Sequence, residues 1–312
     1  CLTLAEEMRR DGRDSIFICR ASAGDLRAEI SRRGFGLTLL PPVAIDRGGS
    51  RATEAYENWL RATWARDPQD TVHALAGLGA MPDWLVVDHY GIDRRWERAL
   101  RPHTGRIMVI DDLANRAHDC DLLLDQNLAT QLAERYEHLV PSHCVRLLGP
   151  HYALLRDEFR CARARLKERT GEVQRLLVFF GGVDQADMTS RTLRAMSEMN
   201  NRRFAVDVVI GSGSAHRGSV TALAGEMEQV AVHVQTTEMA QLMAEADLSI
   251  GAGGTTTWER AYLGLPSLVV TVADNQREMT DAVARAGVCR NLGWHEDVAE
   301  SDIAEALTEM CA

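Results

Sequence analysis

Glycine-rich and polar stretches follow several apolar runs of this sequence and contain the side chains that could do chemistry. The run at 247–250 is followed by GAGGTTTWE, which supplies Gly253, Gly254, Thr255, Thr256 and Glu259. Glycines let backbone N–H groups approach a ligand without obstruction by a Cβ atom. The N-terminus of a following helix favours a phosphate. Gly181 and Gly182 follow the run at 176–180 in the same way, so both loops are candidate phosphate sites.

Glu259 has two interpretations that the residues alone leave open. Thr256-x-x-Glu259 is a capping-box pattern, in which the glutamate bonds back to the N–H of the cap. A carboxylate one turn inside the helix could instead accept two hydroxyls of a ribose. Neither glycine loop has the lysine of GxxxxGK[ST], so a P-loop is excluded.

The stretch VVDHYG supplies three consecutive protic side chains after the apolar run at 84–87: Asp88, His89 and Tyr90. Asp88 could simply cap the next helix, with its two neighbours as polar groups at the edge of the core. We favour a ligand-facing role, because histidine is a natural general base near pH 7 and tyrosine can hold an amide or a hydroxyl. We interpret Asp111 and Asp112 as a turn and a cap.

These stretches are positioned by apolar runs that alternate with helical patterns. Most runs are nearly continuous, as expected of parallel strands covered on both faces, and ligands of such sheets bind at the carboxyl ends of the strands. The alternation predicts α/β domains with doubly wound sheets. The expected strands are 15–19, 84–87, 106–110, 121–124, 176–180, 204–210, 230–234, 247–250 and 267–272, and the expected helices include 185–199, 238–246, 256–263 and 276–286.

The alternation of apolar runs and helical patterns is interrupted once, by the long basic stretch YALLRDEFRCARARLKERTG, which has a helix-like pattern. We therefore predict one domain over 1–150, a connecting segment over 151–171 and a second domain over 172–312. Arg156 lies in the connecting segment and could reach into an interdomain cleft, although a solvated face is the simpler reading of each arginine there.

Composition limits the function. The chain has 312 residues, a net charge of −10 and a pI near 5.5, which argues against nucleic acid as a main partner. No apolar run approaches the roughly 20 residues that span a bilayer. The seven cysteines are scattered without a CxxC pair, which is typical of reduced thiols and predicts a cytoplasmic protein. No metal-ligand spacing and no G-x-S-x-G elbow occur.

Several stretches together resemble one family. VVDHYGID, IDDLANRAHDCDLLLDQN, GPHYALLRDEFR, VFFGGVD and GAGGTTTWERAYLGLPSLVV…DNQ are similar to the PseG family of UDP-2,4-diacetamido-2,4,6-trideoxy-β-L-altropyranose hydrolases, which are related to the spore-coat protein SpsG. The later glycine loop also resembles the UDP-binding turn of MurG-type glycosyltransferases. The resemblance implies a GT-B fold, with two facing Rossmann-like domains, parallel sheets and a cleft between them.

The resemblance implies a metal-independent hydrolase without a cofactor, in which water attacks the anomeric carbon of a UDP-sugar with inversion and releases UDP. It implies that Glu259 and its glycine loop hold UDP and that Gly181 and Gly182 line the phosphates. It also implies that His89 and Tyr90 face the sugar. The further ligand contacts that it implies are Arg156, Asn275 and Gln276.

One departure concerns the start of the sequence. CLTLAEEMRRDG has the pattern of an amphipathic helix already under way, so we expect a strand and a loop to precede Cys1. The family's water-activating histidine lies in a Gly-x-Gly-His loop directly before this helix. We therefore predict a weakly active or inactive chain, with activity in the complete protein, and leave open whether His89 replaces the base.

Three other functions remain open. A glycosyltransferase would use the same UDP site with a sugar or lipid acceptor in place of water. A non-catalytic protein would bind the nucleotide-sugar without turnover. A nucleotide-sugar 2-epimerase is suggested by fold analogy alone.

Overall fold

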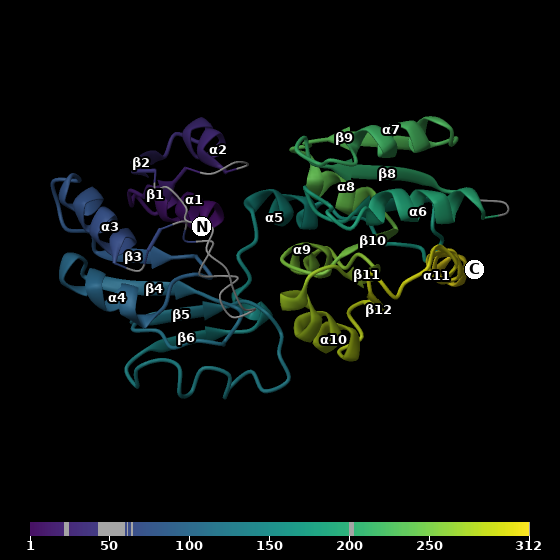
Figure 1. Cartoon of the computed structure of the whole chain (residues 1–312). Helices are drawn as coiled ribbons and strands as arrows, with labels where there is room; N and C mark the ends of the chain where they lie inside the picture. Colours follow the sequence, from purple (N-terminus) through teal and green to yellow (C-terminus); the bar gives the residue numbers. More distant parts are fainter. Residues whose placement is uncertain (22–24, 43–59, 61, 64, 200–202, 312) are drawn as a thin grey trace. The chain divides into compact units, whose positions relative to one another are not determined.

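The computed structural model describes residues 1–21, 25–42, 60, 62, 63, 65–199 and 203–311 (Figure 1). The described chain divides into two compact units. The first comprises Cys1–Asn127 and Gln131–Leu154, and the second comprises Leu128–Thr130 and Leu155–Ala312. Each unit has parallel strands and a hydrophobic core of its own.

The second unit is built on one six-stranded sheet in which every pair of neighbours is parallel. Its order is β12-β11-β10-β7-β8-β9. The strands are β7 (Arg175–Phe179), β8 (Ala205–Ile210), β9 (Val230–Val234), β10 (Leu248–Ala252), β11 (Ser267–Thr271) and β12 (Arg290–Trp294). The central strands β10 and β11 are buried at every residue, which explains their continuous apolar pattern.

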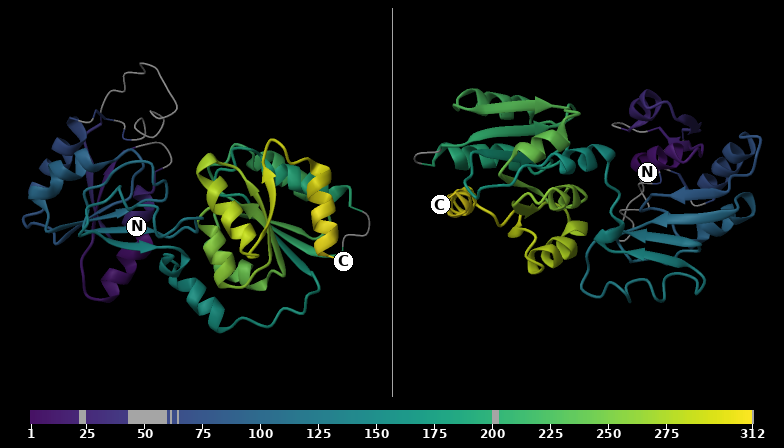
Figure 2. Two further views of the ribbon diagram at one scale, coloured as in Figure 1. Left: turned by 90° about the horizontal axis from the view of Figure 1, so that it is seen from below. Right: turned by 180° about the vertical axis from the view of Figure 1, so that it is seen from behind.

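Helices cover both faces of this sheet, and Figure 2 shows its strands between helices. They are α5 (Asp157–Ala164), α6 (Met188–Ser197), α7 (Arg217–Gly225), α8 (Met239–Glu245), α9 (Thr256–Tyr262), α10 (Arg277–Arg285) and α11 (Glu300–Met310), with a short 3-10 turn η5 (Asp274–Gln276). Side chains of α6, α7 and α11 share one core cluster, and those of α5 and α8 share another.

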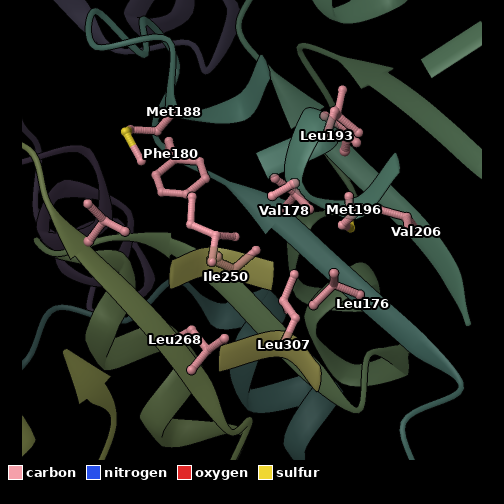
Figure 3. Close-up of a cluster of buried hydrophobic side chains, with 14 of the residues drawn as sticks. Leu176, Val178, Phe180, Met188, Leu193, Met196, Val206, Ile250, Leu268 and Leu307 are labelled. Atoms are coloured by element: carbon pink, nitrogen blue, oxygen red, sulfur yellow. The ribbon is translucent and has the colours of Figure 1, made fainter. Parts of the chain in front are cut away.

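Successive residues of β7 supply the two cores alternately, as the period of two in a strand requires. Leu176 and Val178 pack in the cluster of α6 and α11, whereas Leu177 packs in the cluster of α8. Figure 3 shows the first cluster, with Leu193 of α6 and Leu307 of α11 beside the sheet. The sheet is therefore the middle layer of a three-layer unit.

The strand order reverses at β7. The chain runs outward from β7 through β8 to β9, returns to the other side of β7 as β10, and continues through β11 to β12. In open parallel sheets, this reversal leaves a crevice at the carboxyl ends of the two strands that flank it, and ligands bind there. The two glycine loops of the sequence leave the sheet at this point, after β7 and β10.

The first unit contains two sheets, not the single doubly wound sheet that we expected. A parallel pair consists of β1 (Ile16–Arg20) and β2 (Gly36–Leu40). A parallel four-stranded sheet has the order β3-β4-β5-β6. Its strands are β3 (Trp84–Val87), β4 (Arg106–Ile110), β5 (Leu122–Asp125) and β6 (Val145–Leu148).

The two sheets of this unit have separate packing partners. Residues of α1 (Leu2–Arg10) and α2 (Arg27–Arg32) form a small core with β1 and β2. The four-stranded sheet packs on α3 (Arg66–Ala76) and α4 (Arg94–Leu100), and Ile18 of β1 joins that core. The short 3-10 turns η3 (Arg101–His103) and η4 (Pro150–Tyr152) complete the unit.

Most predicted elements are present, with two kinds of error. Three strands were not predicted: β2, β6 and β12. The helix-like stretch 152–170 forms only the short helix α5, and the chain after it is irregular. There Arg169 donates hydrogen bonds to carbonyls at the ends of α8 and α9, including those of Ala246 and Leu263. In the described part of the chain, no helix is long and apolar enough to cross a membrane.

The core around α6 gives a stability test. Leu193 is fully buried, so Leu193→Ala should leave a cavity and lower the free energy of unfolding by about 2–5 kcal/mol in urea titrations. Val288, which is 42% exposed, is the matched control, and Val288→Ala should change stability by less than about 1 kcal/mol. Equal losses in the two variants would contradict the proposed core.

Candidate functional site

The end of β10 and the loop after it need glycine at three positions, each for its own reason. A Cβ atom on Gly251 would lie 2.2 Å from the carbonyl oxygen of Phe179 in the neighbouring strand β7. A Cβ atom on Gly253 would lie 2.4 Å from Oγ1 of Thr280 on α10. Gly254 has a φ of 111°, which side-chain-bearing residues rarely adopt. Close packing against the Phe179 backbone accounts for Gly251, close packing against the Thr280 side chain for Gly253, and a special turn for Gly254.

This loop presents backbone N–H groups that have no internal partner. Within the described residues, the N–H groups of 253–256 donate no hydrogen bond to protein atoms. The first bonds of α9 come later, from the N–H of Thr257 to Gly254 O at 2.9 Å and from that of Trp258 to Thr255 O at 3.1 Å. Thr255 is the N-cap, and its side chain caps no N–H group. Consecutive unpaired N–H groups form a concavity that suits an anion.

The loop after β7 is held by its neighbours. Gly181 has a φ of 96°. Asp184 closes the loop by accepting the N–H groups of Met188 and Thr189 at 3.0 and 2.8 Å, so it caps α6. A Cβ atom on Gly211, which follows β8, would lie 2.1 Å from the carbonyl oxygen of Gly182. The backbones of these two loops are therefore in close contact.

Glu259 does not form the capping box. The N-cap of α9 is Thr255 rather than Thr256, and Glu259 instead accepts hydrogen bonds from Nε and NH2 of Arg156 at 3.2 and 3.0 Å. The Glu259 side chain is 13% exposed, and burial raises its pKa above the usual range of glutamate, although Arg156 partly offsets this. Both residues belong to the second unit, so Arg156 orients Glu259 within that unit.

Gln276 and Asn275 follow β11 in the short turn η5. Oε1 of Gln276 accepts the N–H of Val272 at 3.2 Å. Nε2 of Gln276 would lie 3.7 Å from a Cβ atom on Gly254, so this side chain borders the glycine loop. Asn275 is half-buried in the same turn. The loops after β10 and β11 therefore meet at Gln276.

The three protic residues after β3 lie in the first unit. Asp88 is exposed and does not cap α4, because the N-cap of α4 is Asp93, whose side chain accepts the N–H of Arg95 at 2.8 Å. Nδ1 of His89 accepts the N–H of Gly91 at 3.0 Å. The neutral ring then carries its proton on Nε2 and has no lone pair there to accept a proton from water.

Tyr90 belongs to a polar network at the carboxyl ends of β3, β4 and β5. Its hydroxyl donates to Oδ1 of Asp112 at 2.7 Å, and Nδ2 of Asn127 donates to Oδ2 of Asp112 at 2.9 Å. Burial is the main cause that raises the pKa of Asp112. The phenol proton of Tyr90 is thus donated to Asp112, and this bond holds the Tyr90 ring in the network.

The turn interpretation holds for Asp111 alone. Oδ2 of Asp111 accepts the N–H of Ala114 at 3.0 Å, whereas Asp112 reaches across to Tyr90. The network continues through the buried hydroxyl of Tyr136, which lies 3.0 Å from Oδ2 of Asp111 and 3.1 Å from Oδ2 of Asp125. Asp111 thus forms a turn, whereas Asp112 binds Tyr90. The sequence alone does not distinguish these two roles.

Two residues near these sites were missed from the sequence. Asp112 had a signal, since the Asp pair follows a predicted strand. Arg260 had no such signal in the sequence, because an arginine next to Glu259 is expected to be solvated. In the structure it is 3% exposed and lies against β10. No group of three or more His, Cys, Asp or Glu residues that could hold a metal ion occurs in the described ranges.

The fold defines the class of protein. The structure of MurG from Acinetobacter baumannii is similar, with a TM-score of 0.62 and 13% identity over 100% of this chain and 86% of that chain. UGT89C1 from Arabidopsis thaliana, in complex with UDP, has a TM-score of 0.65 and 12% identity over 100% of this chain and 87% of that chain. The chain has the GT-B fold, with parallel sheets in two Rossmann-like domains.

Sequence comparisons give finer similarities. Residues 176–312 match the glycosyltransferase family 28 C-terminal domain. The spore coat polysaccharide biosynthesis protein SpsG of Bacillus subtilis is 29% identical over 50% of this chain and 46% of its own length. The UDP-2,4-diacetamido-2,4,6-trideoxy-beta-L-altropyranose hydrolase of Campylobacter jejuni is 26% identical over 65% of this chain and 71% of its own length.

An uncharacterized protein of Methanocaldococcus jannaschii is 23% identical over 72% of this chain and 47% of its own length. The chain thus spans about half of the length of two of these three curated relatives.

The protonation of Asp125 in this polar network can be tested through the pH dependence of stability. Burial raises the pKa of Asp125 to about 6, despite the N–H of Asn127 and the charge of Arg135. The native carboxyl therefore binds its proton more tightly than the unfolded one. This contribution to the free energy of unfolding is complete below about pH 4 and is lost as pH rises towards about 6.

Asp125→Asn should remove this loss of stability with rising pH. Between about pH 4 and pH 6, the free energy of unfolding of the variant should therefore rise relative to that of the original protein by up to about 3 kcal/mol. Urea unfolding at several pH values measures it. Glu134→Gln, at an exposed position of the same unit, should leave the pH dependence unchanged. Parallel curves for Asp125→Asn and the original protein would show that Asp125 is ionised throughout this range.

Proposed function

We propose that this protein binds a UDP-sugar and hydrolyses its anomeric C–O bond with inversion. The products are UDP and a free diacetamido-trideoxy sugar, as in the biosynthesis of pseudaminic acid. The similarity to the Campylobacter hydrolase supports the substrate, and the motif resemblance supports the same assignment.

One observation of the second unit carries the proposal. The unpaired N–H groups of 253–256 and the arginine-held carboxylate of Glu259 lie on one continuous loop and helix at the strand-order reversal. The N–H groups suit the diphosphate, with Gly181 and Gly182 on the neighbouring loop. Glu259 suits the ribose hydroxyls, because Arg156 holds one carboxylate oxygen and leaves the other without a donor among the described residues.

The proposed nucleotide site also includes residues from the loops after β10 and β11, namely Thr255, Thr256, Asn275 and Gln276. UDP gains negative charge as it leaves. N–H groups that already point to the diphosphate stabilise this charge without reorganisation. The protein therefore needs no metal ion for this step in the proposal.

Asp88, His89 and Tyr90 belong to the first unit, and the proposal keeps them as candidate sugar contacts on the motif resemblance alone. Tyr90 is the candidate contact to an acetamido group or a hydroxyl of the sugar, and its bond to Asp112 fixes the position of the phenol. Asp88 and His89 lie on the same loop. Because Nδ1 of His89 accepts the N–H of Gly91, His89 is a poor general base in this geometry, and the proposal assigns the deprotonation of water to none of the described residues.

A glycosyltransferase is the second candidate. The match of residues 176–312 to the glycosyltransferase family 28 C-terminal domain supports it directly. In that case the same UDP site serves a donor sugar, and a hydroxyl of an acceptor replaces water. A non-catalytic binder and a 2-epimerase fit the same nucleotide site, but no contact in the structure favours them.

An activity assay of the protein separates these functions. With UDP-2,4-diacetamido-2,4,6-trideoxy-β-L-altropyranose in water alone, we expect UDP release that EDTA does not inhibit. In water labelled with heavy oxygen, the label should enter the sugar and be absent from UDP, because the C1–O bond breaks. Release that requires an added acceptor would identify a glycosyltransferase, and binding without release a non-catalytic protein.

The ribose contact has its own test. Glu259→Gln should weaken UDP binding by about 1.5–3 kcal/mol, because a charge-assisted hydrogen bond is lost, as measured by calorimetry. Removal of one ribose hydroxyl in deoxy-UDP should weaken binding to the original protein but have little further effect on the variant.

Glu158→Gln is the matched control, because Glu158 pairs with another nitrogen of Arg156 at 2.7 Å. This variant should bind UDP and deoxy-UDP like the original protein. If Glu259→Gln and the original protein lose the same affinity for deoxy-UDP, Glu259 does not contact the ribose.

A further inference from the structure

Arg260 is a buried cation at the end of β10. Its side chain leaves α9 and donates from NH2 to the carbonyl oxygen of Ala252 at 2.8 Å and to Oγ1 of Thr257 at 3.2 Å. The residue is 3% exposed. Its Nε is buried and has no hydrogen-bond acceptor in the described residues. The guanidinium is therefore only partly satisfied by protein atoms.

The guanidinium lies at the strand-order reversal. A Cβ atom on Gly251 would be 2.8 Å from NH1 of Arg260 and 2.2 Å from the carbonyl oxygen of Phe179 in β7. The charge is thus packed against the backbone of β10, on the side of β7, immediately before the loop 253–256. Glycine at 251 is what allows the arginine to approach the strand so closely.

No carboxylate forms an ion pair with this cation in the described residues, and Glu259 acts on it only as a nearby charge. No carboxylate lies within 4 Å of Arg260 among the described residues, and the adjacent Glu259 is paired with Arg156. Burial lowers the pKa of Arg260 to about 10, so the side chain remains charged at neutral pH. An unpaired buried charge is unfavourable, and an anion placed nearby relieves the cost.

We propose that Arg260 is a positioning residue whose buried charge attracts the diphosphate of the nucleotide onto the glycine loop 253–256 from beneath, without contacting it. The inference rests on the proposed nucleotide site and adds the source of its positive potential. The loop N–H groups supply the hydrogen bonds, and Arg260 supplies a full charge at short range. In a low-dielectric environment, such a charge is little screened by salt.

The test compares ligands that differ in phosphate. Calorimetry of the protein with UDP, UMP, uridine and inorganic pyrophosphate measures how each affinity depends on phosphate. Arg260→Met, which keeps the length and removes the charge, should weaken UDP and pyrophosphate binding about tenfold or more and UMP binding less. Uridine binding should be unchanged. Arg260→Lys, which keeps the charge, should remain within about threefold of the original protein for UDP.

Arg169→Met is the matched control, because Arg169 also donates to several backbone carbonyls but lies at the ends of α8 and α9. It should lower thermal stability and leave the affinity ratio of UDP to uridine unchanged. If Arg260→Met weakens UDP and uridine equally, or weakens neither, the charge has no role in ligand binding and the inference is wrong.

Failure of the proposed function gives a different pattern. If the original protein binds pyrophosphate but not UDP, the proposal that the site binds a uridine nucleotide is wrong. Loss of pyrophosphate binding in Arg260→Met would in that case still show that the charge of Arg260 attracts the diphosphate. If Arg260→Met does not fold, the affinities of Arg260→Lys decide. A tenfold loss of UDP with this charge-conserving variant would overturn the inference.

Discussion

The second unit depends on the close approach of backbone and guanidinium at residue 251. Only hydrogen fits where Gly251 faces both the Phe179 carbonyl and the side chain of Arg260. This contact brings the ends of β7 and β10 together and fixes the start of the loop that follows. The position of that loop in turn determines where α9 begins and where Glu259 points. Steric exclusion at one backbone position thus sets the geometry of the candidate site.

The candidate site also illustrates how one arginine can replace a capping interaction. The Thr256-x-x-Glu259 pattern satisfies the sequence requirement of a capping box, but the two donors of Arg156 bind the carboxylate more strongly than a single backbone N–H would. The N–H groups at the start of α9 consequently remain available. A helix start that leaves its donors unused is less stable by itself, and this is a cost that binding sites commonly carry.

The fold was largely predictable because buried parallel strands have continuous apolar sequences. The predicted runs 84–87, 106–110 and 230–234 coincide with β3, β4 and β9. The strands β2, β6 and β12 escaped prediction because β2 and β6 contain exposed residues and β12 contains a glycine. The shortened helix over 152–170 reflects a tertiary effect, since the bonds of Arg169 to distant carbonyls compete with helical structure that the local pattern favours.

The site residues were predictable in part, for a related reason. Positions directly after strands are visible in the sequence, which is why the glycine loops and the DHY stretch could be selected. Partners that come from elsewhere in the chain are not visible. The bond between Tyr90 and Asp112 spans 22 positions, and that between Arg156 and Glu259 spans 103. Burial of Arg260 likewise depends on the absence of a side chain nine residues earlier, at Gly251.

The contacts of Arg169 have a practical meaning for dissection of the chain. Residues 155–169 carry α5, whose Phe159 is fully buried in the core with α8, and end in Arg169, which is anchored to two helix termini. A fragment that starts at the first strand of the second unit would expose that apolar surface and leave several carbonyls without donors. An expression boundary placed ahead of Leu155 keeps residues 155–169, including the Arg156 that binds Glu259, in the same polypeptide as the second unit.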